Sequence, residues 1–147
     1  MGKVSKEVPL SEITLRKYER PYETDRRSII KKLCLSIGLL QPGDSRDVVV
    51  DVLQAVLDSE KPLNSEEIGK KVIELRKNAK IPILGVAPSN IRRQLKRLRD
   101  IYLVDKQQNN YMITENENLI TLFEEKIEKF YLKAIVERIK EYCKALK

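Results

Sequence analysis

The most chemically distinctive stretch of the chain is a dense run of cationic side chains. Arg92–Arg99 contains five arginine or lysine residues in eight positions and no acidic residue. Such guanidinium and ammonium groups suit phosphate oxygens, because they neutralise negative charge and donate strong hydrogen bonds. The chain has a net charge of +7, and all of its basic excess lies in residues 1–43 and 88–114. A basic excess confined to short segments is the expected electrostatic footprint of a surface that meets a polyanion.

The composition argues against an enzyme, a metal site and a cofactor. The chain has no histidine and no CxxC motif, and its glycines are scattered singly. These absences exclude histidine general bases, Ser/His/Asp triads, most zinc sites and glycine-rich phosphate loops. A carboxylate-based enzyme stays open in principle, although no paired acids mark a pocket. The sequence gives no indication of a small-molecule effector.

The cysteines and the hydropathy pattern indicate a cytoplasmic protein. Cys34 and Cys143 both fall in helical apolar patterns, which predicts buried thiols in a reducing compartment rather than a disulfide. No apolar run approaches the roughly 18 residues of a membrane span, and the N-terminus lacks the apolar core of a secretory signal. The high lysine and glutamate content, without histidine or tryptophan, is compatible with a thermophilic, archaeal source.

The basic run lies on a predicted helix over residues 88–100. Pro88 suits the first turn, where its missing N–H leaves no hydrogen bond unmade. At about 100° per residue, Ile91, Leu95 and Leu98 share one narrow apolar face that points inward. The remaining positions divide into outward residues, Ser89, Arg93, Lys96 and Asp100, and flanking residues, Asn90, Arg92 and Arg97.

The neighbouring segments predict two more helices before this one and a β-hairpin after it. A helix capped by Asp44 or Ser45 precedes a second helix, whose start is marked by a capping box of Asn64 and Glu67. The predicted strands are Tyr102–Lys106 and Asn110–Thr114, with a further short strand over Ile81–Leu84.

Three helices followed by a two-stranded hairpin form the element order of the winged helix-turn-helix family, and residues 44–114 resemble that family. The matching motifs are Leu63–Ile68, the run PSNIRRQLKRLRDI at 88–101, Leu103–Val104 entering the hairpin and Tyr111–Thr114 leaving it. The link at Lys77–Ala87 is longer than the roughly three or four residues of a simple helix-turn-helix. The resemblance implies a mainly α fold, a winged helix-turn-helix with a small β-hairpin wing, extra N-terminal helices and a long C-terminal helix.

A helix of this kind fits the DNA major groove, where side chains near its N-terminal end reach base edges. The predicted base contacts are Ser89, Asn90 and Arg93. The predicted phosphate contacts, which position the protein without reading sequence, are Arg92, Lys96, Arg97 and Arg99. By resemblance, the hairpin tip approaches a neighbouring groove through Lys106, Gln107, Gln108 and Asn109.

Residues 1–43 are predicted to form a tail followed by helices over Leu10–Glu19 and Ile29–Leu40. Thr24 is the expected N-cap of the second helix. Its polar face carries a second basic cluster, which consists of Arg26, Arg27, Lys31 and Lys32. Two interpretations stay open: the cluster widens a DNA footprint, or it pairs with acidic residues of the C-terminal helix.

Residues 115–147 are predicted to form one long helix that opens on a capping box of Thr114 and Glu117 and runs to about Leu146. Its apolar pattern shifts phase at Ala134–Ile135, so it is not one uninterrupted heptad seam. The stripe either covers helices of its own domain or forms a dimer seam. Because so long a helix exceeds what a small body covers, we expect a homodimer. The predicted seam residues are Phe123, Ile127, Phe130, Tyr131, Ile135, Ile139 and Tyr142.

Together these features predict a double-stranded DNA-binding protein associated with the nucleoid, either a dimeric transcription regulator or a chromosome-organising factor. Three regions are expected: N-terminal helices in 1–43, the winged domain in 44–114 and the dimerisation helix in 115–147. The alternative is a winged-helix protein-interaction module in a replication, segregation or transcription assembly. A steep salt dependence of duplex binding distinguishes the DNA-binding role from this alternative.

Overall fold

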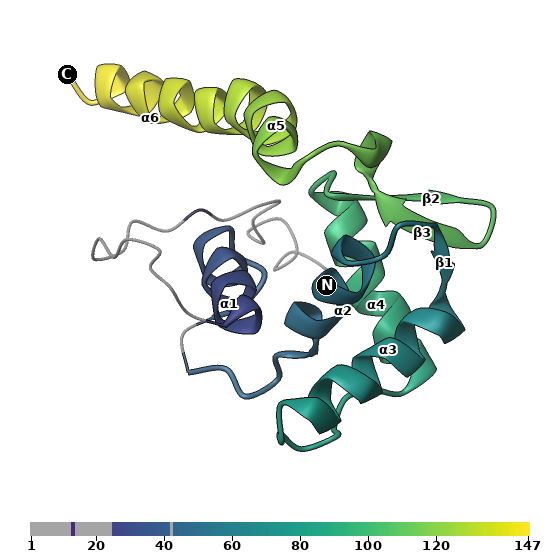
Figure 1. Cartoon of the computed structure of the whole chain (residues 1–147). Coiled ribbons are helices and arrows are strands. Elements are labelled where there is room, and N and C mark those ends of the chain that lie inside the picture. Colours follow the sequence, from purple (N-terminus) through teal and green to yellow (C-terminus); the bar gives the residue numbers. More distant parts are fainter. Residues whose placement is uncertain (1–12, 14–24, 42) are drawn as a thin grey trace, which may run out of the picture.

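The computed structural model describes residues 13, 25–41 and 43–147 (Figure 1). Over this part the chain is mainly helical with a small antiparallel sheet, as the sequence predicts. The elements are α1 (Arg26–Ser36), α2 (Val48–Leu57), β1 (Leu63–Asn64), α3 (Ser65–Asn78), α4 (Pro88–Asp100), β2 (Val104–Gln107), β3 (Asn110–Ile113), η2 (Thr114–Asn116), α5 (Leu119–Leu122), η3 (Phe123–Leu132) and α6 (Lys133–Ala145). The helix predicted over Leu10–Glu19 lies outside the described residues. No helix in the described ranges has the length and apolar character needed to cross a bilayer.

Helix α2 forms the centre of the body, because it packs against α1, α3, α4 and the sheet. Its sequence, VVVDVLQAVL, is apolar on all sides, and its residues are buried from Val48 to Val56. A helix that is apolar all round must be covered all round, which the surrounding elements achieve (Figure 1). Asp51 lies fully buried in the middle of this helix, and its partners are described below.

The start of α3 confirms the predicted capping box. The Asn64 side chain accepts a hydrogen bond from the Glu67 N–H, and the Glu67 carboxylate accepts one from the Asn64 N–H, both at 2.9 Å. The same residues extend the sheet, because β1 pairs with β3 through the register Leu63↔Tyr111. The short strand predicted over Ile81–Leu84 is absent, and that segment is irregular. Pro82 has no N–H to donate to a strand ladder.

The predicted hairpin is present, displaced by one or two residues. β2 and β3 pair antiparallel, with Gln107 opposite Asn110, and the sheet order is β1-β3-β2. Tyr102 has a positive φ of 63°, so the first strand begins only at Val104. Gln108 at the tip also has a positive φ, 56°, as a tight turn between twisted strands requires.

Two predicted N-caps are one to three residues away from the observed ones. α1 is capped by Asp25 rather than Thr24, and the Asp25 carboxylate accepts a hydrogen bond from the Ser28 N–H. α2 begins after Asp47 rather than after Asp44 or Ser45, and the Asp47 side chain makes no capping bond. The Asp47 carboxylate is instead bound to arginines of α1 and α3.

The capping box predicted for Thr114 and Glu117 is wrong. Thr114 opens a short 3-10 turn in which Glu115 has a φ of 55°, so the chain is not yet helical there. The long helix starts after Asn118, whose side chain accepts a hydrogen bond from the Thr121 N–H at 2.8 Å.

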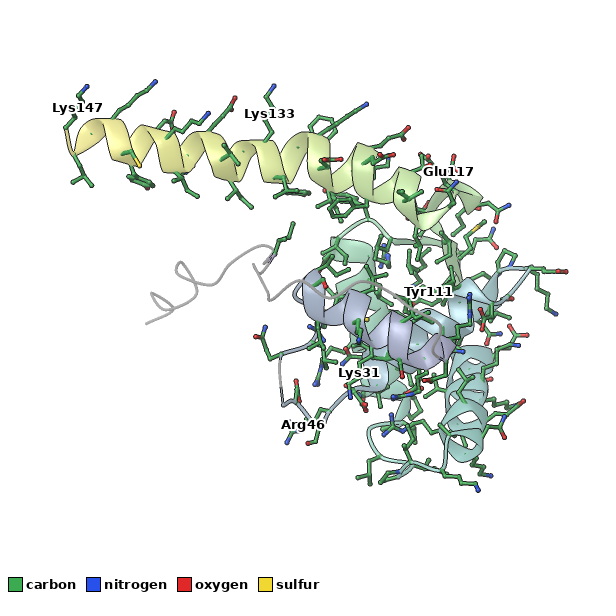
Figure 2. All side chains as sticks on the ribbon, turned by 60° about the vertical axis from the view of Figure 1, so that its left-hand side comes forward. Lys31, Arg46, Tyr111, Glu117, Lys133 and Lys147 are labelled. Atoms are coloured by element: carbon green, nitrogen blue, oxygen red, sulfur yellow. The ribbon has the colours of Figure 1, made fainter. Side chains whose placement is uncertain are left out.

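From that point α5, η3 and α6 run as one rod that projects from the body (Figures 1 and 2). Leu122 and Ile127 are buried at its base, whereas α6 buries none of its side chains against the described part of the chain. The η3 stretch is a π-helix, whose i→i+5 hydrogen bonds turn the chain less per residue than an α-helix does. It ends just before Ala134–Ile135, where the apolar pattern changes phase.

Candidate nucleic-acid interface

Helix α4 presents one face to the core and the opposite face to solvent, as its sequence predicts. Ile91, Leu95 and Leu98 are buried, with at most 1% of each residue exposed. Pro88 occupies the first turn. The outward residues of the predicted wheel are exposed, namely Ser89, Arg93, Lys96 and Asp100.

Three guanidinium groups on α4 are available to a partner. Arg92, Arg93 and Arg99 are exposed and form no hydrogen bond or ion pair with any residue that the structure describes. Lys96 pairs with Asp100 at 3.1 Å, but their side chains are 71% and 58% exposed. Exposed pairs of this kind contribute about 0–1 kcal/mol, so Lys96 can exchange Asp100 for another anion at little cost.

One flank of α4 is instead used to hold the helix in place. The Asn90 side-chain amide donates to the Gly85 carbonyl at 2.7 Å and accepts from Gln94. Arg97 donates to Gln94 and, at 2.6 Å, to the Leu39 carbonyl between α1 and α2. Asn90 and Arg97 were predicted as DNA contacts, but their hydrogen-bonding groups are engaged within the chain. Their role in the structure is to orient α4.

The hairpin tip is exposed and carries a single cation. Lys106, Gln107, Gln108 and Asn109 all face solvent. The Lys106 ammonium lies 5.5 Å from the centre of the Tyr111 ring on the neighbouring strand. This cation–π contact holds the charge on the hairpin without neutralising it.

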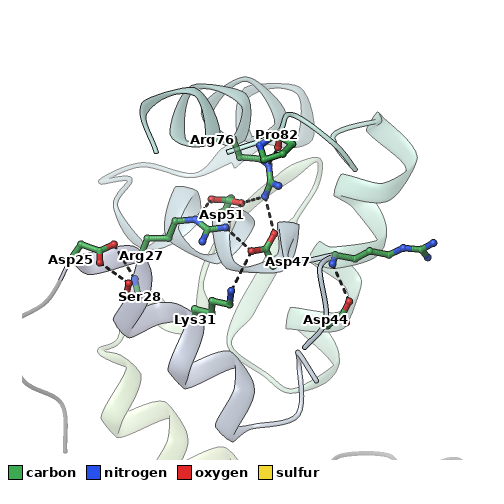
Figure 3. Close-up of polar contacts among 10 residues, drawn as sticks. Asp25, Arg27, Ser28, Lys31, Asp44, Asp47, Asp51, Arg76 and Pro82 are labelled. Carbon is green, nitrogen blue, oxygen red and sulfur yellow. Dashed lines mark hydrogen bonds and ion pairs between the residues drawn. The ribbon is translucent and has the colours of Figure 1, made fainter. Parts of the chain in front are cut away.

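The second basic cluster does not form a free surface. Arg27 bonds to Asp51 at 3.1 Å and to Asp47 at 3.1 Å (Figure 3). Lys31 lies 3.7 Å from Asp47, and Arg26 pairs with Asp58 at 2.6 Å. Their partners are therefore acids of α2 and its two ends. None of these three residues pairs with the C-terminal helix, which was one of the two interpretations. Arg27 is held inside the body, whereas the side chains of Arg26 and Lys31 are 56% and 41% exposed, so a wider DNA footprint stays a prediction for those two.

Sequence reasoning missed the residue that completes this ion cluster, Arg76 of α3. Arg76 is 4% exposed and donates to Asp51 at 2.7 Å, to Asp47 at 3.1 Å and to the Pro82 carbonyl at 2.8 Å (Figure 3). It follows Val72 by four residues and so lies on the apolar face of its helix. A charged residue on the apolar face of a helix indicates a buried ion pair, because charged side chains are seldom buried without a partner. Asp51 in the valine run of α2 is a second example. The cluster ties α1, α2, α3 and the link before α4 together.

The cluster changes the ionisation of its own members. Burial disfavours the Asp47 carboxylate, but its hydrogen bonds with Arg27 and Arg76 outweigh burial and lower the pKa of Asp47. Burial likewise opposes the charge of Arg27, yet the hydrogen bonds with Asp51 and Asp47 raise the pKa of Arg27.

These pKa changes predict a specific loss of stability in acid. A carboxylate whose folded pKa is lowered stabilises the fold fully above its unfolded pKa, about 3.9, and loses that contribution as pH falls through the folded value. We expect Asp47→Asn to reduce the free energy of unfolding by about 2 kcal/mol at pH 7, and the difference from wild type to shrink progressively as pH falls below about 3.9 and through the lowered folded pKa of Asp47. Urea unfolding across pH 2–7 measures this. Glu74→Gln, an exposed change on α3, is the control, and a pH-independent Asp47→Asn effect would contradict the assignment.

The two cysteines differ in their surroundings. Cys34 is fully buried, and burial raises the pKa of its thiol to about 12, so it stays protonated and unreactive at neutral pH. Cys143 is exposed on α6, so its predicted burial is wrong. Both thiols are free, as predicted.

The predicted dimer seam divides into a docked part and an exposed part. Phe123 and Ile127 lie at the base of the rod, half-buried and buried. The Tyr131 hydroxyl donates to that of Tyr102 at 3.1 Å, and the two rings stack with centroids 6.0 Å apart. The exposed members, with 40–66% of each residue accessible, are Phe130, Ile135, Ile139 and Tyr142.

Comparisons with protein-family models, with curated proteins and with solved structures each find no match to this chain. The described residues contain no group of three or more histidine, cysteine or acidic side chains arranged to hold a metal ion.

Proposed function

We propose that this protein is a winged helix-turn-helix that binds double-stranded DNA. The order α2, β1, α3, α4, β2, β3, with β1 added to the edge of the hairpin, supports that fold. The observation that carries the function is the exposed face of α4, where Arg92, Arg93 and Arg99 have no partner among the described residues. A helix anchored on one side and cationic on the other fits the DNA major groove.

The contacts divide by their place on α4. Ser89 and Arg93, in the first two turns, are placed to reach base edges, where arginine pairs with guanine. Arg92, Lys96 and Arg99 are placed for phosphates, which supply most of the affinity. The hairpin tip contributes Lys106, with Gln107, Gln108 and Asn109 as polar neighbours. Asn90 and Arg97 support the site by holding α4.

The proposal includes a homodimer formed through the rod. Six large apolar residues stand exposed along its outer part, and monomeric proteins seldom expose such a continuous apolar surface. They are Phe130, Ile135, Val136, Ile139, Tyr142 and Leu146. The charges favour a second copy as the occupant, because η3 has three acidic and two basic residues and α6 has two acidic and four basic residues. Antiparallel packing places the basic half of one rod beside the acidic half of the other.

Removal of the free arginines tests the DNA-binding proposal. In a fluorescence-anisotropy titration of a random duplex, we expect the triple variant Arg92→Ala, Arg93→Ala, Arg99→Ala to bind roughly 150-fold more weakly, at about 1 kcal/mol per lost charged contact. The slope of log affinity against log salt should fall by about 2, because Arg92 and Arg99 are placed for phosphates and about 0.9 counterions are released per phosphate neutralised. The single variants Arg93→Ala and Lys96→Ala should each weaken binding without loss of fold, seen by circular dichroism.

A matched control removes the same charge elsewhere. Lys133→Ala, Lys140→Ala, Lys144→Ala takes three positive charges from α6. At protein concentrations where sedimentation shows this variant to be as dimeric as wild type, it should leave duplex affinity within about threefold, since distant exposed charges are screened. Equal losses of duplex affinity in both triple variants would mean that the net charge of the protein, and not the face of α4, accounts for binding. No duplex binding by wild type at low salt would favour a protein-interaction module instead.

The titration also separates the two DNA-binding roles. A transcription regulator prefers its own site by a large specificity ratio, about 10³ or more over random duplex. A chromosome-organising factor binds random duplexes nearly equally, because phosphate contacts carry no sequence information. Selection from a random duplex library followed by titration of the enriched sequence distinguishes them.

A further inference from the structure

A pocket of about 820 Å³ lies beside the exposed face of α4. Its walls come from the loop before α2 and the start of α2, from the end of α3 and the link to α4, and from α4. The lining residues are Asp44, Ser45, Arg46, Asp47, Val48, Arg76, Ile81, Pro82, Leu84, Gly85, Asn90, Arg93, Gln94 and Arg97. The volume falls within the about 300–1,000 Å³ typical of small-molecule sites.

The pocket lining carries more positive than negative charge, with four arginines against Asp44 and Asp47. Arg76 is paired with Asp47 inside the ion cluster, and Arg97 is bonded to Leu39. The remaining cations are Arg46 and Arg93, whose side chains are exposed and make no bond within the described ranges. Arg46 projects from the loop before α2 (Figure 2). Because a guanidinium donates in a planar fork, two of them across a pocket suit a carboxylate.

Part of the lining is an apolar wall. Val48, Ile81 and Pro82 line it, and Leu84 at the link is 69% exposed. An apolar surface next to unpaired guanidinium groups does not match a bare phosphate of DNA, which has no apolar part. It matches a small organic acid whose hydrocarbon portion covers the wall while its carboxylate meets the arginines.

The wall is held in its shape before any ligand arrives. The Pro82 carbonyl is bound by Arg76 at 2.8 Å, and the Gly85 carbonyl by Asn90 at 2.7 Å. Gly85 has a φ of +74°, and a Cβ there would lie 3.1 Å from the Val48 Cγ2 atom. This close approach requires glycine and fixes the link against α2. A pre-formed wall avoids the entropy cost of ordering a loop on binding.

We propose that this pocket binds an apolar organic acid between Arg46 and Arg93, and that the bound acid weakens DNA binding. The second part depends on the proposed function, because Arg93 belongs both to the pocket and to the face of α4 that meets DNA. A carboxylate paired with Arg93 competes with a base or phosphate for the same guanidinium group. The two ligands therefore oppose each other's binding by equal factors.

Octanoate is a suitable probe for the site, with octanol as the neutral molecule of the same chain length. In ¹H–¹⁵N NMR spectra of the full chain, octanoate should cause saturable shifts at Val48, Leu84, Gly85 and Arg93. Octanol should bind at least tenfold more weakly. Shifts confined to α6, no shifts, or equal affinity for octanol and octanoate would each overturn the site.

Two single substitutions of equal charge locate the carboxylate. Arg46→Gln should weaken octanoate binding at least tenfold, because Arg46 lines the pocket and has no assigned DNA contact. Arg92→Gln, on the other flank of the same helix as Arg93, should leave octanoate affinity unchanged. A larger loss of octanoate affinity in Arg92→Gln than in Arg46→Gln would contradict the proposed carboxylate position. An unchanged octanoate affinity in Arg46→Gln would contradict it as well.

A duplex titration in saturating octanoate tests the regulatory part. We expect at least threefold weaker DNA binding by wild type and no change in Arg46→Gln. If octanoate binds and the DNA affinity is unchanged, the proposed regulation is wrong, whereas the proposed ligand site still stands. If octanoate binds but wild type binds no duplex in its absence, the proposed DNA-binding function fails, and the regulation fails with it.

Discussion

Replacing Asp51 with asparagine should cost about 3–5 kcal/mol of folding free energy, the expected penalty for breaking a buried ion pair from one side. Asp51 is fully buried and accepts hydrogen bonds from Arg27 at 3.1 Å and from Arg76 at 2.7 Å. The asparagine keeps the shape of the side chain but leaves these guanidinium groups without its charge. Domains of this size are stable by only about 5–15 kcal/mol, so the variant should be marginally folded.

Urea unfolding at pH 7, followed by circular dichroism, measures this loss. Asp58→Asn is the matched control, because Asp58 also pairs with an α1 arginine across the same two helices. The side chains of that pair, Arg26 and Asp58, are 56% and 41% exposed, and such surface pairs contribute about 0–1 kcal/mol. A cost below about 1 kcal/mol for Asp51→Asn, equal to that of the control, would mean that the ion cluster does not hold the body together.

Ile139→Glu should convert the proposed homodimer to a monomer. Ile139 lies in the middle of the exposed apolar part of the rod and is 56% exposed. In a dimer the substitution places a carboxylate in an apolar seam, at a cost of at least about 3 kcal/mol. Such a cost weakens association about 150-fold. Because α6 buries none of its side chains against the described part of the chain, the fold itself should be unaffected.

Sedimentation equilibrium measures the outcome, with an expected wild-type mass of twice the 17.1 kDa of one chain. Lys144→Glu introduces the same side chain about 140° around the α6 helix from Ile139 and should leave the dimer intact. A monomeric wild type, or equal effects of the two substitutions, would contradict the proposed seam. Thermal unfolding of Ile139→Glu separates loss of the dimer from loss of the fold.

The local pattern of the sequence was enough to predict most elements and their orientation. Asn64 and Glu67 marked the start of α3, and Pro88 the start of α4, because capping and the missing proline N–H act over three or four residues. The inward face of α4 followed from the spacing of Ile91, Leu95 and Leu98. The two-residue strand β1 could not be predicted in this way, because it is a strand only through its pairing with β3, which lies far along the chain.

The partners of the charged residues were beyond the reach of such patterns. Hydropathy periodicity placed Arg97 on a flank of α4, but its hydrogen bond goes to Leu39, 58 residues away. Arg27 and Arg76 likewise meet Asp51 across separations of 24 and 25 residues. Arg46 is flanked by acids in the sequence and so added no local basic excess, although the fold places it at the same pocket as Arg93.

The sequence by itself therefore determined the helices, the hairpin and the cationic face of α4, since these depend on side-chain periodicity and on capping within a few residues. Only the tertiary structure decided which cations stay available and that a pocket lies beside them. Ion pairs depend on charged groups that the packing of distant segments brings within about 3 Å of each other. The walls of a pocket likewise come from segments that are distant in the sequence. No local pattern encodes those distances.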